Sequence, residues 1–383
     1  MITYPVGLLS NKGSDAILIT MTPTVLFTAG INLTFASGTL TIDWKDGSTP
    51  ENFVSGVELT HQYVSAGTYI AEITGDLTNI TAFVADNCKI TGIANLKTGL
   101  LTNFTINNNL YSGDLDMSLA PISGRLWTYT NSGLTGITFA SSGNAIITDT
   151  RLYSCNFSTL DFTNVPLSGR FECQSNSGLT GITFANSGNA KFTLTRMYSC
   201  NLTGTLDLSN NPVGGTVQIY SNPNLTDITF ASSGNTIILN FSLASNDLTG
   251  TLDLSNVPVG TTVQINSNSN LTGITFASSG NGNIFGFLFI SNSLNYVDFT
   301  NLSFAIINGS LRLENNSMAV ADVNHELVDL YSLVSGEGAG GDYTGRTIRI
   351  DGTNAAPDSS SGGYNGTQAI IDLTAKGITV TTS

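Results

Sequence analysis

Residues 134–144 read LTGITFASSGN, the same eleven letters return at 271–281, and near copies stand at 179–189 and 225–235. A second word, LTGTLDLSN, occupies residues 202–210 and 248–256. The residues that anchor these words and their neighbours recur every 22–24 positions: Leu110, Leu134, Phe157, Leu179, Leu202, Leu225, Leu248, Leu271, Leu294 and Met318. A fixed period of this length predicts a solenoid, in which each unit buries its apolar edge only against the next unit.

The two words alternate, so a longer period of 45–46 residues overlays the short one. Within one unit, residues 216–220 read as a strand in which Val217 and Ile219 point inward. Gln218 and Tyr220 then point outward, because side chains alternate across a strand. No helical spacing is visible inside the units, so we expect strands and turns on both sides of the solenoid.

The segment 241–248, FSLASNDL, has the spacing L-x-L-x-x-N-x-L and is followed by L-T-G-x-L. This pattern resembles the plant-type leucine-rich repeat. The resemblance implies a second short strand at the L-T-G segment and a ladder of Asn or Cys residues that satisfies backbone groups in the turn. Two departures stand out: the units lack the proline of the plant-type motif, and they alternate between two versions.

The cysteines follow the repeat. Cys88, Cys155 and Cys200 each stand two residues before an anchor, in the phase that Asn108, Asn246, Asn292 and Asn316 hold in other units. Cys155 and Cys200 are two units apart, which separates them by about 10 Å at the usual strand spacing. A disulfide cannot span that distance. We therefore expect all four cysteines, Cys173 included, to be reduced and buried.

Residues 1–75 form a separate region. It contains TLTIDWKDGS at 39–48, H-Q-Y at 61–63 and GTYIAEI at 67–73, which read as alternating strands around a turn. These three stretches resemble the PKD domain, a small immunoglobulin-like β-sandwich. The resemblance implies a spacer or adhesive module without activity. Residues 1–38 match less clearly and leave room for an attachment arm.

Residues 319–383 change character again. We expect a helix at 322–333 capped by Asp322, a strand at 347–352, a helix at 367–377 stopped by glycine, and a last strand at 378–382. This order resembles the C-terminal ends of phage structural and fibre-like proteins. The predicted fold is mainly β: an N-terminal β-sandwich (1–75), a leucine-rich-repeat solenoid of about ten units (76–318), and a small α/β C-terminal cap (319–383).

The composition limits the partners. The formal net charge is -14 and only 10% of residues are charged. Too few Lys and Arg are present to neutralise nucleic-acid phosphates or to dock on an anionic membrane. No apolar run reaches the length needed to span a bilayer, so we expect no membrane insertion. The first residues lack the pattern of a secretion signal, which fits a virion component released by lysis or a mature protein whose signal was removed.

Residues for catalysis are scarce. The chain has two histidines, His61 and His325, which we expect to be a packed residue of the N-terminal module and a lone surface residue. No metalloprotease, nucleophile-elbow or P-loop motif occurs. Asp43 and Asp46 could hold Ca²⁺, but an Asp-Gly turn needs no metal. We expect no enzymatic activity, no catalytic residue, no metal site and no cofactor.

The outward side chains of the long sheet are the remaining candidates for a binding site. The first half is rich in Tyr, Trp and Arg, which dominate binding surfaces, although aromatics also simply favour strands. The candidate binding residues are Trp127, Tyr129, Arg151, Tyr153, Arg196, Tyr198, Gln218 and Tyr220. The same phase makes Thr105, Asn107, Glu172 and Gln174 outward-facing, and places Leu288 and Ile290 where the cap or a subunit would cover them.

These expectations favour a non-enzymatic virion structural protein, an appendage, fibre or decoration, that displays its solenoid for structural or host-surface binding. It would contact other virion proteins through its N-terminal module, assemble as a homo-oligomer and meet a host glycan or protein. The alternative is a secreted bacterial cell-surface adhesin with the same order of modules, binding protein or glycan.

Overall fold

The structure is a computed structural model that describes residues 15–302, 307–336 and 343–383. It is mainly β, with 43% of residues in strands and 9% in helices, and it contains a β-solenoid of about ten turns. The chain divides into two compact units, Met1–Ala190 and Lys191–Ser383, each described here by itself. The solenoid and the mainly β class are thus as the repeats predict.

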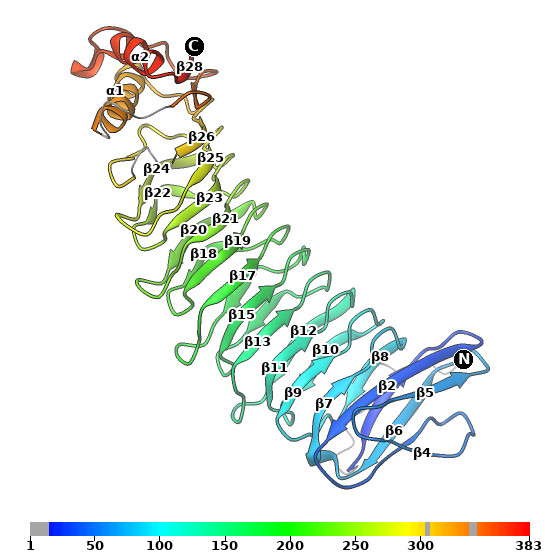
Figure 1. Ribbon diagram of the computed structural model, residues 1–383. Coiled ribbons are helices and arrows are strands. Elements are labelled where there is room, and N and C mark those ends of the chain that lie inside the picture. The colour runs from blue at the N-terminus through cyan, green and yellow to red at the C-terminus, as the bar shows by residue number, and fades with distance from the viewer. Residues whose placement is uncertain (1–14, 303–306, 337–342) are drawn as a thin grey trace. The chain divides into compact units, whose positions relative to one another are not determined.

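The first unit begins with antiparallel strands (Figure 1). They are β1 (Ile17–Met21), β2 (Phe27–Phe35), β3 (Leu40–Asp43), β4 (Glu51–Asn52), β5 (Glu58–Tyr63), β6 (Tyr69–Gly75), β7 (Ile80–Val84) and β8 (Ile90–Ala94), with a 3-10 turn at Leu77–Asn79. One sheet has the order β4-β3-β6-β1-β8, and β2 pairs with both β5 and β7. Trp44 and Tyr63 are fully buried, so this region has its own core.

Strand β7 joins this region to the solenoid, because it pairs antiparallel with β2 and parallel with β9. The long parallel sheet continues through β9 (Leu101–Thr105), β11 (Ile122–Trp127), β13 (Ile147–Arg151) and β15 (Leu167–Glu172). The return strands on the second face are β10 (Ser112–Met117), β12 (Gly133–Phe139), β14 (Thr159–Asp161) and β16 (Gly181–Thr183). Each turn of the solenoid therefore consists of one strand on each face and two corners.

The second unit repeats this plan. Its long parallel sheet holds β17 (Phe192–Arg196), β19 (Val213–Gln218), β21 (Ile238–Ser242), β23 (Val259–Gln264), β25 (Ile284–Leu288), β26 (Ile307–Arg312), β27 (Thr347–Ile350) and β28 (Thr379–Thr382). Its return strands are β18 (Thr203–Leu208), β20 (Asn224–Phe230), β22 (Thr249–Leu254) and β24 (Asn270–Phe276). Val217 and Ile219 are fully buried, as the alternation of the strand predicts.

An asparagine ladder closes the first corner. Asn131 is fully buried, donates to the carbonyls of Ile106 (2.9 Å) and Thr128 (2.8 Å), and accepts the N–H of Tyr111 at 3.1 Å. Each amide thereby connects one turn to the turn before it, which leaves few backbone groups of the corner unpaired. The other ladder asparagines also donate to a carbonyl of the preceding turn: Asn109, Asn176, Asn222, Asn246, Asn268, Asn292, Asn316 and Asn354.

Cysteine can replace asparagine in this ladder. All four are buried, and none forms a disulfide. Cys155 takes the place of an asparagine: its thiol contacts the carbonyl oxygen of Thr128 at 3.2 Å, and its N–H donates to Oδ1 of Asn176 at 3.1 Å. Burial raises the pKa of the Cys155 thiol to about 12 and that of Cys88 to about 11. Both thiols therefore stay protonated at neutral pH, which makes them poor nucleophiles.

Two positions of the predicted repeat are wrong. Leu110 is 52% exposed, and Tyr111 at 1% exposure takes the place of the anchor. Asn109, rather than Asn108, is the ladder residue of that turn, and Asn108 has the left-handed backbone (φ 56°) of the residue before it. The reason is that Tyr111, rather than the leucine before it, stands 23 residues before Leu134 and two residues after the ladder asparagine, which a count of leucines does not show.

The doublet has a structural cause at both corners. After Asn131, Asn176, Asn222 and Asn268 the chain takes one extra residue, and the N–H of the following leucine donates back to the asparagine carbonyl. At the opposite corner, each asparagine of a second set accepts a backbone N–H from the long-sheet strand of the preceding turn and donates within its own turn: Asn144, Asn189, Asn235 and Asn281. One unit in two carries these longer corners, which produces the period of 45–46 residues.

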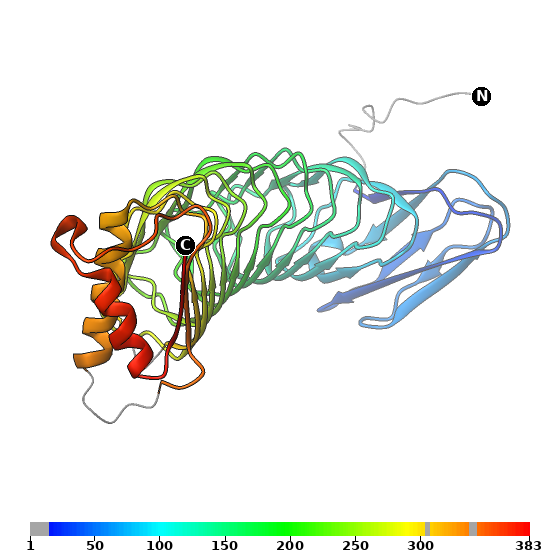
Figure 2. The same cartoon turned by 90° about the horizontal axis from the view of Figure 1, so that it is seen from above.

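Helices lie at the C-terminal end of the second unit. They are α1 (Val320–Gly336), α2 (Gly366–Ala375) and a 3-10 turn at Ser361–Gly363, and Figure 2 shows α1 and α2 side by side. The prediction that Asp322 caps the first helix is wrong, because α1 begins two residues earlier and Asp322 lies in its first turn. Gly377 follows α2 with a φ of +86°, as the glycine stop predicts. Beyond β26, strands β27 and β28 extend the parallel sheet.

Candidate functional site

The outward face of β11, β13 and β15 carries a grid of planar and charged side chains. Parallel pairing in register places Trp127 beside Arg151 and Arg151 beside Glu172. The same pairing places Arg125 beside Asp149 and Asp149 beside Arg170. We call the charged and indole residues of this grid the arginine patch: Arg125, Trp127, Asp149, Arg151, Arg170 and Glu172.

Trp127 lies against two cations. The guanidinium carbons of Arg125 and Arg151 are 4.1 and 4.0 Å from the centroid of its ring. Cation–π attraction is significant at such distances. The indole Nε1 is buried and has no hydrogen-bond partner among the described residues. The protein's own arginines therefore already contact the ring of Trp127. These contacts fix the orientation of both guanidinium groups on the sheet.

Asp149 lies at the centre of the charges. Arg151 donates to it from Nε at 3.0 Å and from Nη2 at 3.3 Å. Arg125 and Arg170 approach the same carboxylate at 3.9 and 3.8 Å, distances of ion pairs rather than hydrogen bonds. Glu172, only 4% exposed in its side chain, pairs with Arg170 at 3.5 Å and Arg151 at 3.8 Å. Three guanidinium groups therefore face two carboxylates.

Tyr129 and Tyr153 extend the grid beyond the strand ends. Their rings stack with centroids 4.5 Å apart and planes at 12°. Partial burial raises the pKa of both phenols, so each stays protonated and can donate a hydrogen bond at neutral pH. The structure thus brings four of the predicted residues together on the first unit: Trp127, Tyr129, Arg151 and Tyr153.

The other four predicted residues form a similar group on the second unit. Nε of Arg196 donates to Oε1 of Gln218 at 3.0 Å. Tyr198 and Tyr220 stack with centroids 4.5 Å apart and planes at 3°. Partial burial raises the pKa of the Tyr220 phenol.

Sequence reasoning missed part of the patch. The predicted outward positions cover two residues per strand, and Arg125, Asp149 and Arg170 lie one step earlier on the same face. An Arg or Asp two residues before each predicted position was the available signal. In the other direction, four residues predicted to face outward are nearly buried: Thr105, Asn107, Glu172 and Gln174. Alternation along a strand predicts the direction of a side chain and not how deeply its neighbours bury it.

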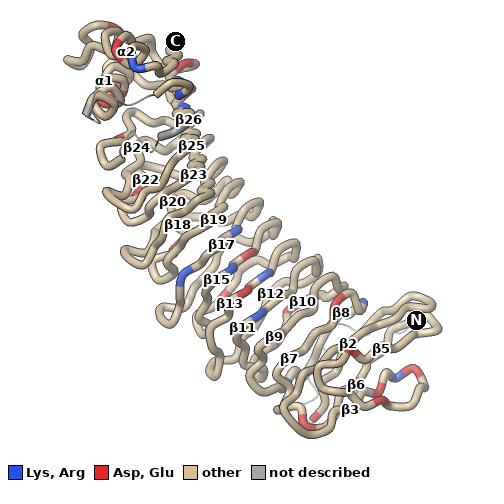
Figure 3. Tube along the Cα trace, viewed as in Figure 1, with Lys and Arg blue, Asp and Glu red and all other residues tan. Residues whose placement is uncertain are grey.

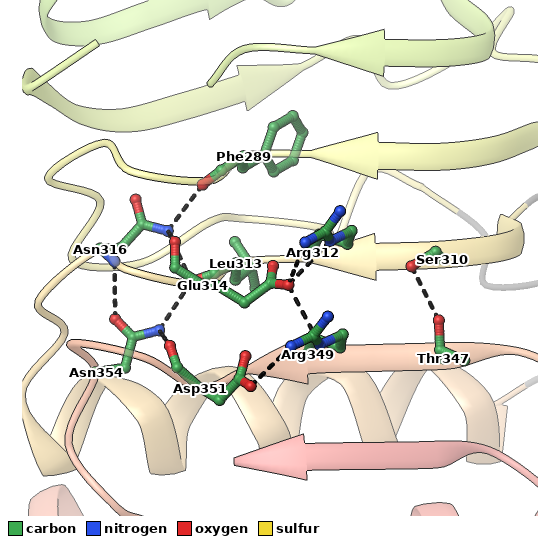
Figure 4. A network of polar contacts seen from close by, with 10 residues as sticks. All are labelled: Phe289, Ser310, Arg312, Leu313, Glu314, Asn316, Thr347, Arg349, Asp351 and Asn354. Atoms are coloured by element: carbon green, nitrogen blue, oxygen red, sulfur yellow. Dashed lines mark hydrogen bonds and ion pairs between the residues drawn. The ribbon is translucent and has the colours of Figure 1, made fainter. Parts of the chain in front are cut away.

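A second polar network lies on the last strands of the second unit (Figure 4). Oε1 of Glu314 accepts from Nε and Nη2 of Arg312 at 2.9 and 2.8 Å and is 3.3 Å from Nε of Arg349. Arg349 also donates to Asp351 at 2.9 Å. Here both arginines hydrogen-bond to the protein's own carboxylates, so this network holds the end of the sheet together. Leu288, at the end of the neighbouring strand β25, and Ile290, just beyond it, are half-buried.

Two carboxylates of the N-terminal region have protein partners. Asp43 accepts from the N–H and ammonium group of Lys45, at 2.9 and 2.7 Å. Asp46 accepts from the N–H of Ser48 at 3.0 Å and lies 2.8 Å from Nε2 of His61, and the pKa of its carboxyl is lowered to about 2. His61 also stacks on Trp44 at 4.7 Å. Asp43, Asp46 and His61 thus hold the turn between β3 and β4.

His325 differs from the prediction of a lone surface residue. Its ring stacks between Tyr296 (4.4 Å) and Tyr364 (4.2 Å), and its Nε2 is 3.3 Å from Asp329. These contacts connect α1 to the segments on either side of it. Among the described residues, no group of three or more His, Cys, Asp or Glu side chains could hold a metal ion.

Comparisons with known proteins give no relative: no protein-family model, no curated protein and no solved structure matches the chain. None of the helices in the described part of the chain has both the length and the apolar character that crossing a membrane requires.

Proposed function

We propose that this chain is a non-enzymatic virion structural protein, an appendage, fibre or decoration, whose solenoid presents a binding face to the host surface. The observation that carries the proposal is the arginine patch with its neighbouring tyrosines. Planar side chains are held in fixed orientation on paired strands, and such residues dominate binding surfaces because they lose little entropy on contact. A rigid repeat that displays them suits recognition better than catalysis.

Two resemblances support a place in an extracellular assembly. The corner asparagines and the two-strand turns are consistent with a leucine-rich-repeat relationship of plant type. The packed cluster of Trp44, His61 and Tyr63 is consistent with a PKD-like, immunoglobulin-fold sandwich in the N-terminal region. Under this proposal the N-terminal region attaches the chain to other virion proteins, in a homo-oligomeric assembly, and the C-terminal helices cap the solenoid.

Mass spectrometry of purified virus particles and of the cell envelope of their host tests the location. The proposal expects peptides of this chain in the particles at a fixed ratio to the other structural proteins. Peptides found in the envelope fraction and absent from particles would contradict it and favour the cell-surface adhesin.

Binding to the host surface is tested with a labelled full-length chain. Replacing Tyr129 and Tyr153 by Ala removes the stacked pair of the first unit and should weaken binding at least about tenfold. Leu119→Ala is a matched control, because Leu119 is 59% exposed and lies away from the grid. Unchanged binding by the tyrosine variant would remove this face from the proposal.

A further inference from the structure

All three arginines of residues 1–190 lie in the arginine patch, although the chain carries a formal net charge of -14. Figure 3 shows these basic positions over β11, β13 and β15. Arg125, Arg151 and Arg170 face the two carboxylates of Asp149 and Glu172, so the patch has an excess of one positive charge. Charges further away are screened beyond about 8 Å at physiological ionic strength, and an approaching group meets mainly the patch.

Two of the three arginines have unused donors. The side chains of Arg125 and Arg170 are 44% and 38% exposed. Neither guanidinium donates a hydrogen bond among the described residues, and their nearest carboxylate oxygens lie at 3.9 Å for Arg125 and 3.5 Å for Arg170. Arg312, in contrast, donates at 2.9 and 2.8 Å to Glu314. The guanidinium groups of Arg125 and Arg170 therefore lie at ion-pair distance from the protein's own carboxylates and still have N–H donors that an outside anion can accept from.

These guanidinium groups are also held in place. The contact of Arg125 with Trp127 restricts its side chain, and Arg170 lies between Asp149 and Glu172. A planar guanidinium that is already oriented binds a carboxylate through two parallel hydrogen bonds and loses less entropy on binding. The carboxylate of a ligand is the group that fits such a fork.

The strands under the patch argue against a peptide that would bind as an added strand. β11 pairs with β9 and β13, and β13 pairs with β11 and β15, so their backbone groups are already bonded on both sides. A peptide could not add itself as a further strand there. The groups that remain are guanidinium forks, tyrosine hydroxyls and flat rings, which suit the hydroxyl and carboxylate groups of a sugar chain.

We propose that the arginine patch binds a carboxylate-bearing polysaccharide, with Arg125 and Arg170 as the residues that contact its carboxylates. Trp127 is a positioning residue that orients Arg125. The inference rests on the proposed function, and it identifies the chemical class of the host-surface ligand as an acidic glycan.

Titration calorimetry of the full-length chain with an oligogalacturonate tests this proposal. The wild-type chain should bind it and should not bind a neutral malto-oligosaccharide of equal length. Arg125→Ala and Arg170→Ala should each weaken binding at least about tenfold, the loss expected for a charge-assisted hydrogen bond. Lys97→Ala, which removes one exposed positive charge away from the patch, should leave the affinity unchanged.

Two further variants separate recognition from charge and from misfolding. Arg125→Lys keeps the charge and loses the fork, so it should bind more weakly than wild type. Asp149→Asn removes the competing carboxylate and should bind more tightly. Thermal unfolding of each variant shows whether it is folded.

Three results would overturn the inference. The first is equal affinity of the wild type and the two arginine-to-alanine variants, and the second is equally tight binding of a polyglutamate peptide. The third is no binding of the oligogalacturonate by a wild-type chain that still binds the host surface, which would leave the proposed function standing.

Discussion

Thr150 shows at the residue scale how the repeat tolerates an imperfect side chain. It occupies a core position, in register with Leu126 and Phe171 on neighbouring strands. Its side chain is fully buried, and its hydroxyl has no hydrogen-bond partner among the described residues. An unpaired buried hydroxyl is destabilising.

Replacing Thr150 by Val removes this hydroxyl at nearly constant shape. We expect the free energy of unfolding of the first unit to rise by about 1–2 kcal/mol, measured by denaturant titration. Thr148→Val is the control, because Thr148 is exposed and its hydroxyl donates to the carbonyl of Gly124 at 3.1 Å. If Thr150→Val is less stable than the wild type, the Thr150 hydroxyl has a hydrogen-bond partner.

The residue before most ladder positions has a left-handed backbone, and Thr130 is the unusual member of this set. Its φ is 57°, whereas most of the other turns carry serine or asparagine there. A β-branched residue is strained in this region, and asparagine tolerates it. Thr130→Asn should stabilise the protein by about 0.5–1 kcal/mol, while Ser154→Asn should gain less. A loss of stability in Thr130→Asn would count against this assignment of strain.

At the scale of the element, the asparagine corner is the joint of the solenoid. Asn131→Ala removes two donated hydrogen bonds and leaves the N–H of Tyr111 without its acceptor. We expect a loss of about 3 kcal/mol or more in the free energy of unfolding. Asn131→Cys should lose less, because Cys155 shows that a thiol is accommodated in the same phase. An equal loss of unfolding free energy in Asn131→Ala and Asn131→Cys would contradict the view that a thiol can replace the asparagine at this position.

Glycine has two different roles in the strands, which a matched pair separates. Gly215 and Gly250 have φ angles of 64° and 63°. A Cβ on Gly215 would lie 2.4 Å from the carbonyl oxygen of Thr193, whereas one on Gly250 would meet nothing within 4 Å. Gly250→Ala should cost about 1–2 kcal/mol from backbone strain alone, and Gly215→Ala more than about 3 kcal/mol. Calorimetric unfolding that shows the same loss of stability in Gly215→Ala and Gly250→Ala would contradict the close contact between Gly215 and Thr193.

The helix α1 makes stability depend on pH. Burial raises the pKa of Glu326 to about 8 from 4.5; one carboxylate oxygen accepts the N–H of Val297, and the other has no partner among the described residues. Between pH 4.5 and 8 the folded protein holds a proton that the unfolded chain has released. Stability therefore falls as pH rises through this window and is level on either side of it.

Glu326→Gln removes this dependence. We expect the variant to gain on the order of 3–5 kcal/mol relative to wild type at pH 8 and to match it near pH 4. Denaturant unfolding of the second unit at a series of pH values provides the measurement. A variant with the same pH profile as wild type would show that Glu326 does not titrate in this way.

How well the sequence predicts an element depends on whether its signal is periodic. Val217 and Ile219 are buried as alternation predicts, because period two in a strand is set by the backbone itself. Leu110 is exposed although a spacing of 22–24 residues admits it, because the neighbouring Tyr111 fills the buried position, and an aromatic anchor escapes a search for leucines. The helix that contains Asp322 begins earlier than the capping residue predicts, since Val320 and Ala321 extend it without any cap signal.

For the whole molecule, the repeat predicts the solenoid and the phase of its outward side chains, and eight predicted residues form two groups on two units. Which side chains pair within those groups depends on side-chain contacts, and the spacing of residues in the sequence does not predict them. Trp127 illustrates this point: its indole contacts Arg125 and Arg151, and only the structure shows that the protein's own cations occupy it. Function is the least predictable level, because a solenoid serves many partners.

The central claim is that the chain displays the face of β11, β13 and β15 outward on a particle. Immuno-electron microscopy of intact virions tests it most directly, with an antibody whose binding to the full chain is abolished by Arg125→Ala and Arg170→Ala together. The account predicts that this antibody decorates intact particles and blocks their attachment to the host. Particles that contain the chain, remain undecorated and attach normally in its presence would contradict the claim.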